Sequence, residues 1–300
     1  MRITECFNQE KGHVNLEFVD IDANRDTTLF IDPCLIEVGT SSFCVDAANV
    51  MKDYFNGLYS LYKNHCATNE KLNYYQHCHE INATKLGYGS GSNGKAKTAL
   101  GMVETLRGLQ ELVDANLSLE KAIDLPIFIR DFAEDCLSDM LTNILFLQLS
   151  KFTVYICKKH SYPLKKVNSP HYYWDMSDHT WKEYDGEGML VDGKLVLLVP
   201  KDIVRHNYYY NADQYFRSVI LERMQEERTT YDTKGKAIKP SKKSIKAAEL
   251  RSHTDVLDIL KAKTIEQPTL LDLHHQRLNS SYSERTMSDE DLDYWVYKRQ

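Results

Sequence analysis

The sequence contains no Cys-x-x-Cys pair, although seven cysteines are scattered between Cys6 and Cys157. This absence excludes a zinc ribbon, and an odd, scattered set of cysteines is typical of reduced intracellular thiols rather than of a disulfide framework. The chain also lacks any run of about 18 apolar residues, the length of a membrane-spanning helix. Its first residues lack the basic and apolar regions of a signal peptide. We therefore expect a cytoplasmic protein with no membrane-spanning segment.

Positive charge is scarce as well. The chain carries 37 Lys and Arg residues against 43 Asp and Glu residues, a formal net charge of -6. This balance argues against a generally basic nucleic-acid coat protein, although a local basic patch can still bind a phosphate backbone. With 42% hydrophobic and 27% charged residues, the chain is typical of a folded protein that buries a large core.

Hydrophobic periodicity predicts a mixed α+β fold. Alternating and β-branched residues predict a strand hairpin over residues 14–36 and another around Asp192-Gly193. Apolar residues at helical spacing predict helices over the ranges 42–65, 98–115, 132–160 and 208–228. We expect one main domain (residues 1–230) with a central sheet flanked by helices, a basic linker (231–246), and a helical extension with an acidic tail (247–300).

The segment GYGSGSNGKAKT, residues 87–98, has glycines and a lysine at the spacing of a phosphate-binding loop. Ala96, however, stands where such a loop needs the Ser or Thr hydroxyl that holds magnesium. The loop leads into a predicted helix, whose N-terminus attracts anions. We therefore predict that Gly94 and Lys95 contact phosphate, without nucleotide hydrolysis; the alternative is a surface loop that binds nothing.

Acidic residues recur along one face of the predicted helix over residues 132–160. Asp135 and Asp139 are four residues apart and so lie on the same side. Carboxylate oxygens suit Mg²⁺ or Mn²⁺, and this pair is our first candidate for a divalent cation site. Asp32, which ends an apolar segment before Pro33, is a third candidate ligand. A solvated acidic face and a routine Asp-Pro turn are the alternatives.

Two further segments carry candidate residues. The sequence HCHE, residues 77–80, could supply two histidines to zinc, but zinc needs a third ligand that spacing does not identify. Glu80 is the stronger candidate, as a general base or cation ligand. Lys201, at the end of an apolar segment, is a candidate phosphate ligand.

Three segments together, KLGYGSGSNGKAKTALG, FAEDCLSDMLTNILFLQLSKFT and GKLVLLVPKDIV, resemble a group of uncharacterised bacterial proteins associated with mobile anti-phage defence loci. The resemblance covers about residues 80–205, and its most specific elements are Ser138-Asp139, Thr142-Asn143 and the LLVPK strand. It implies a cellular setting in defence and no particular activity. Cys136 departs from the group, which has a basic residue there.

These observations favour a metal-dependent nuclease. Its catalytic residues would be Glu80, Asp135 and Asp139, with Mg²⁺ or Mn²⁺ on Asp32, Asp135 and Asp139. Gly94, Lys95 and Lys201 would bind phosphate, and the basic linker would add affinity that weakens with salt. The alternative is a non-enzymatic sensor or adaptor that binds nucleic acid or nucleotide. Its C-terminal tail, DYWVYKRQ, would dock a partner protein.

Overall fold

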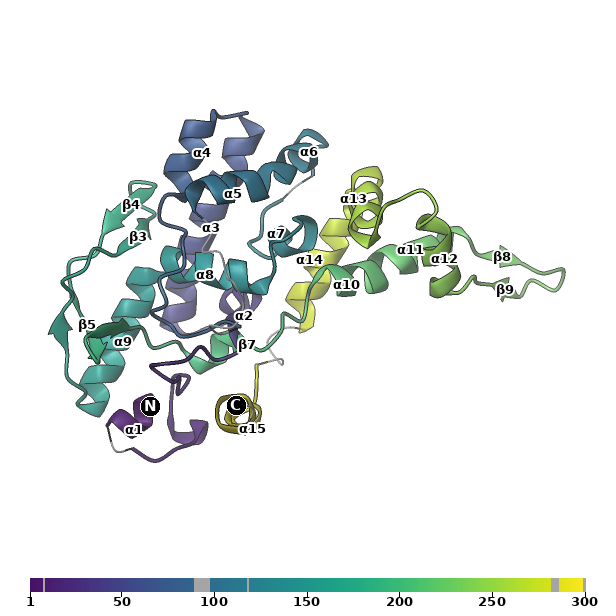
Figure 1. Cartoon of the computed structure of the whole chain (residues 1–300). Helices are drawn as coiled ribbons and strands as arrows, with labels where there is room; N and C mark the ends of the chain where they lie inside the picture. The colour runs from purple at the N-terminus through teal and green to yellow at the C-terminus, as the bar shows by residue number, and fades with distance from the viewer. Residues whose placement is uncertain (8, 89–97, 118, 282–285, 299–300) are drawn as a thin grey trace.

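The computed structural model describes residues 1–7, 9–88, 98–117, 119–281 and 286–298. Helices dominate and strands are short (Figure 1), so the predicted mixed α+β class is confirmed. The helical segments up to residue 203, apart from α8 and α9, are α1 (Ile3–Cys6), η1 (His13–Asn15), α2 (Pro33–Val38), α3 (Ser42–Lys63), α4 (Thr68–Tyr75), α5 (Ala99–Thr105), η2 (Leu106–Gly108), α6 (Leu109–Asp114), α7 (Asp124–Phe128) and η3 (Lys201–Ile203).

α3 is a long helix of the N-terminal half, and it confirms the helix predicted over residues 42–65. Ser41 caps it by accepting a hydrogen bond from the backbone N–H of Cys44 at 3.1 Å. Its apolar residues recur every three to four positions, so one side of the helix faces the core, where Tyr54 and Leu58 are fully buried.

The single helix predicted over residues 132–160 is instead two helices, α8 (Glu134–Ile144) and α9 (Phe146–His160), bent by 74°. Leu145 at the break has φ -93° and ψ 14°, and its side chain is fully buried. A straight helix of this length would extend about 40 Å, whereas the bend keeps both apolar halves in the core. Within the described residues no single helix is long and apolar enough to cross a membrane; only the bent pair together passes on length and composition.

The strands form small separate antiparallel sheets, so the predicted central sheet is wrong. The widest sheet in the described part of the chain has three strands, in the order β2-β5-β6, and the others pair β1 with β7, β3 with β4 and β8 with β9. The strands are β1 (Phe30–Ile31), β2 (Lys165–Lys166), β3 (Tyr172–Asp175), β4 (Thr180–Glu183), β5 (Glu187–Val191), β6 (Lys194–Val196), β7 (Val204–Arg205), β8 (Thr230–Tyr231) and β9 (Ala237–Ile238).

One of the two predicted hairpins forms. β5 and β6 pair around Asp192 and Gly193, whose φ values of 50° and 77° suit a tight turn. The hairpin predicted over residues 14–36 is wrong, because β1 pairs with the distant β7. The residues before β1 are held by isolated bridges instead, including Phe18 with Pro200.

The C-terminal third is helical, as predicted. Its helices are α10 (Ala212–Tyr215), the π-helix η4 (Phe216–Ile220), α11 (Leu221–Glu227), α12 (Lys242–Glu249), α13 (Val256–Glu266) and α14 (Thr269–Ser281). Residues 231–246, predicted as a basic linker, form most of the β8–β9 hairpin and the start of α12. This segment is therefore ordered, and the hairpin projects from the body of the protein (Figure 1).

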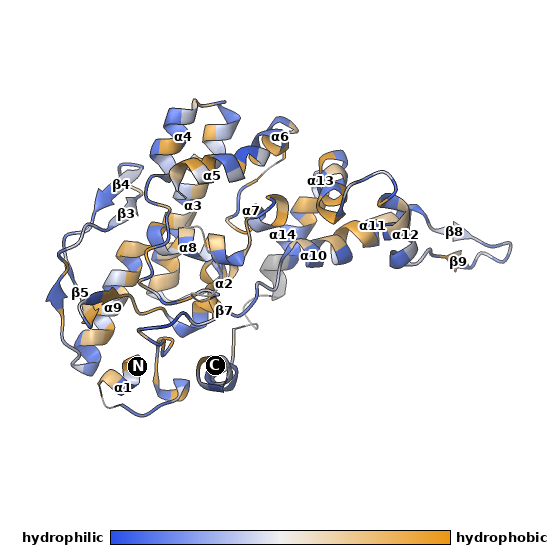
Figure 2. Cartoon of the chain, in the orientation of Figure 1, coloured by the Kyte–Doolittle hydropathy of each residue, from blue (hydrophilic) through white to orange (hydrophobic). Residues whose placement is uncertain are grey.

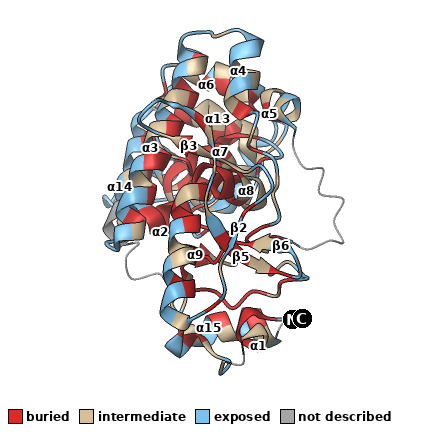
Figure 3. Ribbon diagram, turned by 90° about the vertical axis from the view of Figure 1, so that its left-hand side faces the viewer, coloured by how far each residue is buried: buried red, intermediate tan, exposed pale blue. Residues whose placement is uncertain are grey.

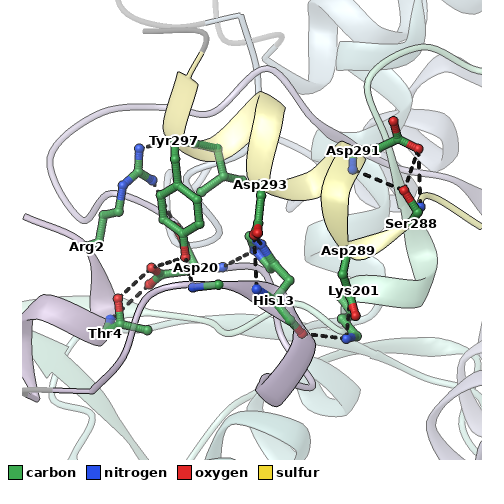
Figure 4. Close-up of polar contacts among 12 residues, drawn as sticks. Arg2, Thr4, His13, Asp20, Lys201, Ser288, Asp289, Asp291, Asp293 and Tyr297 are labelled. Atoms are coloured by element: carbon green, nitrogen blue, oxygen red, sulfur yellow. Dashed lines mark hydrogen bonds and ion pairs between the residues drawn. The ribbon is translucent and has the colours of Figure 1, made fainter.

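Residues 286–298, which we call the C-terminal clasp, fold back onto the N-terminal segment (Figure 4). They form α15 (Asp289–Asp293) and the π-helix η5 (Tyr294–Lys298). The fully buried His13 places Nδ1 2.6 Å from Asp293 Oδ1, and its Nε2 accepts the backbone N–H of Asp20 at 3.1 Å. The Tyr297 hydroxyl donates to the Asp20 carboxylate at 2.8 Å. Side chains from the two ends of the chain thus share one hydrogen-bonded network.

The core lies between α3, α7, α8 and α9. Figure 2 shows apolar stretches along these helices, and Figure 3 shows buried residues on each of them. Because the strands are short, helix packing rather than a sheet provides most of the buried apolar surface.

His274 on α14 is fully buried, and neither of its ring nitrogens has a hydrogen-bond partner in the described structure. Burial lowers its pKa from 6.5 to about 3. Between these two values the unfolded chain binds a proton that the folded chain does not, so stability falls as the pH falls. When the pH is lowered from about 7 to about 5, we expect wild type to lose about 2 kcal/mol more of its unfolding free energy than His274→Leu. Urea unfolding at each pH measures this difference.

Burial lowers the pKa of the neighbouring His275, but the charge and the hydrogen bond of Asp124 together outweigh burial and raise it. His275 therefore shifts stability in the opposite direction. The comparison is therefore between wild type and variant at each pH. His65→Leu, at an exposed histidine, is the control for the loss of an imidazole at the surface. Parallel pH curves for wild type and His274→Leu would contradict the prediction.

Candidate functional site

Asp135 and Asp139 occupy successive turns of α8, as their spacing predicts. Burial raises the pKa of Asp139 to about 8, and the charges of Asp135, Glu80 and Asp26 add to the rise. Burial also raises the pKa of Asp135, followed by the charges of Glu80, Asp26 and Glu134. We call Asp26, Glu80, Asp135 and Asp139 the carboxylate cluster. Asp26, Glu80 and Asp135 each lie close enough to Asp139 to oppose its ionisation.

The segment that leads into the glycine-rich loop passes directly over the cluster. Gly87 has φ 140°, and a Cβ at this position would lie 3.0 Å from Asp135 Oδ1, so only glycine fits without strain. The backbone N–H of Tyr88 donates to the Asp135 carboxylate and partly offsets the rise in its pKa. The predicted phosphate ligands Gly94 and Lys95 lie outside the described residues.

Asn143 ties the chain around Glu80 to α8. Its side-chain amide donates to the backbone carbonyls of His79 at 2.7 Å and of Asp139 at 3.0 Å. Ser138 has a structural contact of a similar kind, because its hydroxyl accepts the backbone N–H of Ile31 at 3.0 Å. These polar residues hold the backbone segments that position the cluster.

A cleft of about 520 Å³ opens next to the cluster. It is lined by Gln76, His77, His79, Glu80, Ile81, Asn143, Pro170, His171 and Tyr172, and we call it the histidine-lined cleft. The His77 ring stacks on Tyr172 with centroids 3.7 Å apart. Burial lowers the pKa of both His77 and His171, and His79 lowers both further. These two imidazoles are therefore neutral at pH 7.

Glu80 connects the two features, since it lines the cleft and also raises the pKa of Asp135 and Asp139. Within the cleft, the Glu80 carboxylate and three imidazoles lie on one concave surface, which is the arrangement expected of a ligand or catalytic site.

Asp32 does not join the groups that raise the pKa of Asp139. It is fully buried and caps α2, where its Oδ1 accepts the backbone N–H of Cys34 at 2.9 Å. In the described ranges, no three His, Cys, Asp or Glu side chains are placed to share a metal ion. The predicted ligand set of Asp32, Asp135 and Asp139 is thus not preassembled, and Asp32 has a structural role instead.

Lys201 also lies elsewhere. Its ammonium donates to the backbone carbonyl of His13 at 2.6 Å and pairs with Asp289 at 2.6 Å, which anchors the C-terminal clasp. The structure therefore separates Lys201 from the cluster and assigns it a contact with the clasp in place of the predicted phosphate contact.

A sequence-family profile described as Domain of unknown function (DUF8370) matches residues 9–211, about two thirds of the chain. The chain belongs to the DUF8370 family. No curated protein and no solved structure matches it. The DUF8370 region contains the carboxylate cluster and the histidine-lined cleft, and it ends at Asn211, the N-cap of α10. The β8–β9 hairpin and the clasp follow it in the chain.

Two residues of the carboxylate cluster and the histidine-lined cleft were not predicted from sequence. Asp26 lies in a polar segment between apolar stretches, where an aspartate is usually a turn residue. His171 belongs to an aromatic segment without helical or strand periodicity. Neither carries a local signal, because both reach the site through contacts between segments that are far apart in the chain.

Proposed function

We propose that the carboxylate cluster and the histidine-lined cleft form the active site of a metal-dependent phosphodiesterase that cleaves nucleic acid. The observation that carries the proposal is the placement of Asp139, one helical turn from Asp135 on α8, where burial and the charges of Asp135, Glu80 and Asp26 raise its pKa to about 8. Holding like charges together costs folding free energy, and such arrangements are concentrated at functional sites. A divalent cation would turn this repulsion into attraction.

The donors fit Mg²⁺ or Mn²⁺. Both ions prefer carboxylate oxygens, and Mg²⁺ is commonly held by one or two carboxylates together with substrate phosphate and water. Asp135 and Asp139 would supply those two carboxylates from adjacent turns of α8. The bound ion would lower the pKa of a water molecule and polarise the phosphate.

Other residues of the protein would accept the proton, hold the phosphate and bind the rest of the substrate. Glu80, which lines the cleft and raises the pKa of Asp139, would accept a proton from the attacking water. Gly94 and Lys95, on the loop that follows Tyr88, would hold the phosphate. The cleft would receive the adjoining part of the substrate, and Tyr172 would offer a ring for stacking against a base.

The test is cleavage of single-stranded and double-stranded DNA and RNA with Mg²⁺ or Mn²⁺. We expect Asp135→Asn and Asp139→Asn each to lower the rate at least about 100-fold, because each removes a charged cation ligand. Asp46→Asn, at an exposed aspartate on α3, is the matched control and should cleave at the wild-type rate. Equal rates for all four proteins, or no cleavage by wild type, would rule out this function.

The resemblance to proteins of defence loci supports anti-phage defence as the cellular setting of this activity. We expect wild type to reduce phage plaque formation in a bacterial host and Asp139→Asn to lose this protection. Protection that survives the substitution would favour the adaptor alternative. Against that alternative stands the C-terminal clasp, because the tail meant to dock a partner is bound to its own chain.

A further inference from the structure

The β8–β9 hairpin projects from the body of the protein on the side of α11 and α12 (Figure 1). Its turn is held by Asp232, whose Oδ1 accepts the backbone N–H groups of Lys234 and Lys236, each at 2.8 Å. Gly235 supplies the left-handed conformation that the turn needs, with φ 76°. The hairpin has a defined shape although none of the residues from 229 to 244 is buried.

We call residues 229–246 the basic arm. It contains six lysines and one aspartate, a local charge of +5 in a chain whose net charge is -6. The single aspartate is engaged in the turn. Lys234, Lys236 and Lys239 are exposed, and the described residues contain no ion pair to any of the three. Their charge is therefore available to an external polyanion.

The arm also exposes two large apolar side chains. Tyr231 is 71% exposed and Ile238 is 55% exposed. Tyr231 pairs with Ala237, and Thr230 pairs with Ile238, so the two apolar side chains lie on opposite faces of the ribbon. A two-stranded ribbon is only marginally stable by itself in water, so core packing does not explain this combination of lysines with an exposed aromatic ring.

We propose that the basic arm is a nucleic-acid-binding element that holds the substrate of the site described above. The choice of nucleic acid as the ligand rests on the proposed function. The inference assigns the binding of this polymer to a part of the chain outside the DUF8370 region. The lysines contact the phosphate backbone, and Tyr231 stacks on a base or packs against a sugar. A two-stranded ribbon also fits the major groove of a duplex.

The experiment measures binding of a short fluorescein-labelled DNA duplex and of single-stranded RNA in EDTA, where metal-dependent cleavage cannot occur. The arm variant carries Lys234→Glu, Lys236→Glu and Lys239→Glu. The control variant carries Lys63→Glu, Lys158→Glu and Lys165→Glu at three exposed lysines elsewhere, with the same change in net charge. Circular dichroism checks that both variants are folded.

We expect the arm variant to bind at least tenfold more weakly than wild type and the control variant to stay within about threefold. The slope of log affinity against log salt should fall by about 2 to 3 in the arm variant, because up to three phosphate contacts are lost. Tyr231→Ala should weaken binding of single-stranded RNA at least about fivefold and leave this slope unchanged.

Three results would overturn the proposal. The first is that wild type binds neither polymer. The second is that both triple variants weaken binding equally. The third is that the arm variant binds nucleic acid normally and loses an acidic protein partner. Because binding is measured without metal, the two proposals fail separately. Binding that depends on the arm, with no cleavage, supports the basic arm and rules out the nuclease. Binding that does not depend on the arm, with cleavage that depends on Asp139, rules out the basic arm and supports the nuclease.

Discussion

Asp139→Asn should raise the free energy of unfolding by about 3 kcal/mol at pH 8 and have little effect at pH 4. The pKa of Asp139 is about 8 in the folded protein against an ordinary value of 3.8. Between these values the folded chain holds a proton that the unfolded chain releases, so the contribution of Asp139 to stability is fully present below pH 3.8 and is lost as the pH rises toward 8. Asparagine is neutral throughout and removes this loss.

The magnitude is smaller than the full pKa difference implies, since Asp139 is partly exposed and solvent screens its charge. The measurement is urea unfolding at several pH values, with Asp46→Asn as the exposed control. Mg²⁺ or Mn²⁺ should stabilise wild type at pH 8 and stabilise Asp139→Asn much less, because an ion that binds only the folded state adds stability. Parallel pH curves for wild type and Asp139→Asn would contradict the like-charge cluster.

Asp20→Ala should destabilise the protein by about 3 to 5 kcal/mol and release the C-terminal clasp. The Asp20 side chain is fully buried and accepts three hydrogen bonds: from the Thr4 backbone N–H at 2.9 Å, the Thr4 hydroxyl at 2.6 Å and the Tyr297 hydroxyl at 2.8 Å. Alanine leaves the two buried donors of Thr4 and the half-buried hydroxyl of Tyr297 without this acceptor. Urea unfolding gives the stability, and the red shift of Trp295 fluorescence reports release of the clasp, since this ring stacks on His206 in the folded protein.

Asp291→Ala is the matched control within the clasp. Asp291 is exposed, and in the described part of the chain its carboxylate accepts hydrogen bonds from the backbone N–H and the hydroxyl of Ser288 at the start of α15. The loss of this carboxylate should cost about 0.5 to 1 kcal/mol. Asp20→Asn keeps one acceptor oxygen and should fall between the two. If Asp20→Ala proves no more costly than Asp291→Ala, the buried network does not hold the two ends of the chain together.

Local patterns in the sequence predicted what depends on neighbouring residues. The spacing of Asp135 and Asp139 places both on one side of α8, as a period of 3.6 residues requires. The Asp192-Gly193 pair predicted its turn because few residues tolerate the left-handed conformation found there. The helix over residues 42–65 followed from its apolar stripe.

Local patterns did not predict features that depend on contacts between segments far apart in the chain. Residues 14–36 have strand-like composition, but β1 finds its partner in β7, well over a hundred residues away. The apolar residues around Leu145 continue a helical pattern, and only packing of both halves against the core explains the bend between α8 and α9. The sequence predicted Lys201 as a phosphate ligand, whereas in the structure it pairs with Asp289.

The sequence by itself determined the mixed α+β class, the helical C-terminal third and the carboxylate pair on α8, because these depend on composition and on spacing within one element. Only the tertiary structure decided that Asp26 and Glu80 join that pair, that His171 completes the cleft, and that the acidic tail binds its own N-terminal segment. Those contacts join segments far apart in the chain, where no local periodicity records which side chains will meet.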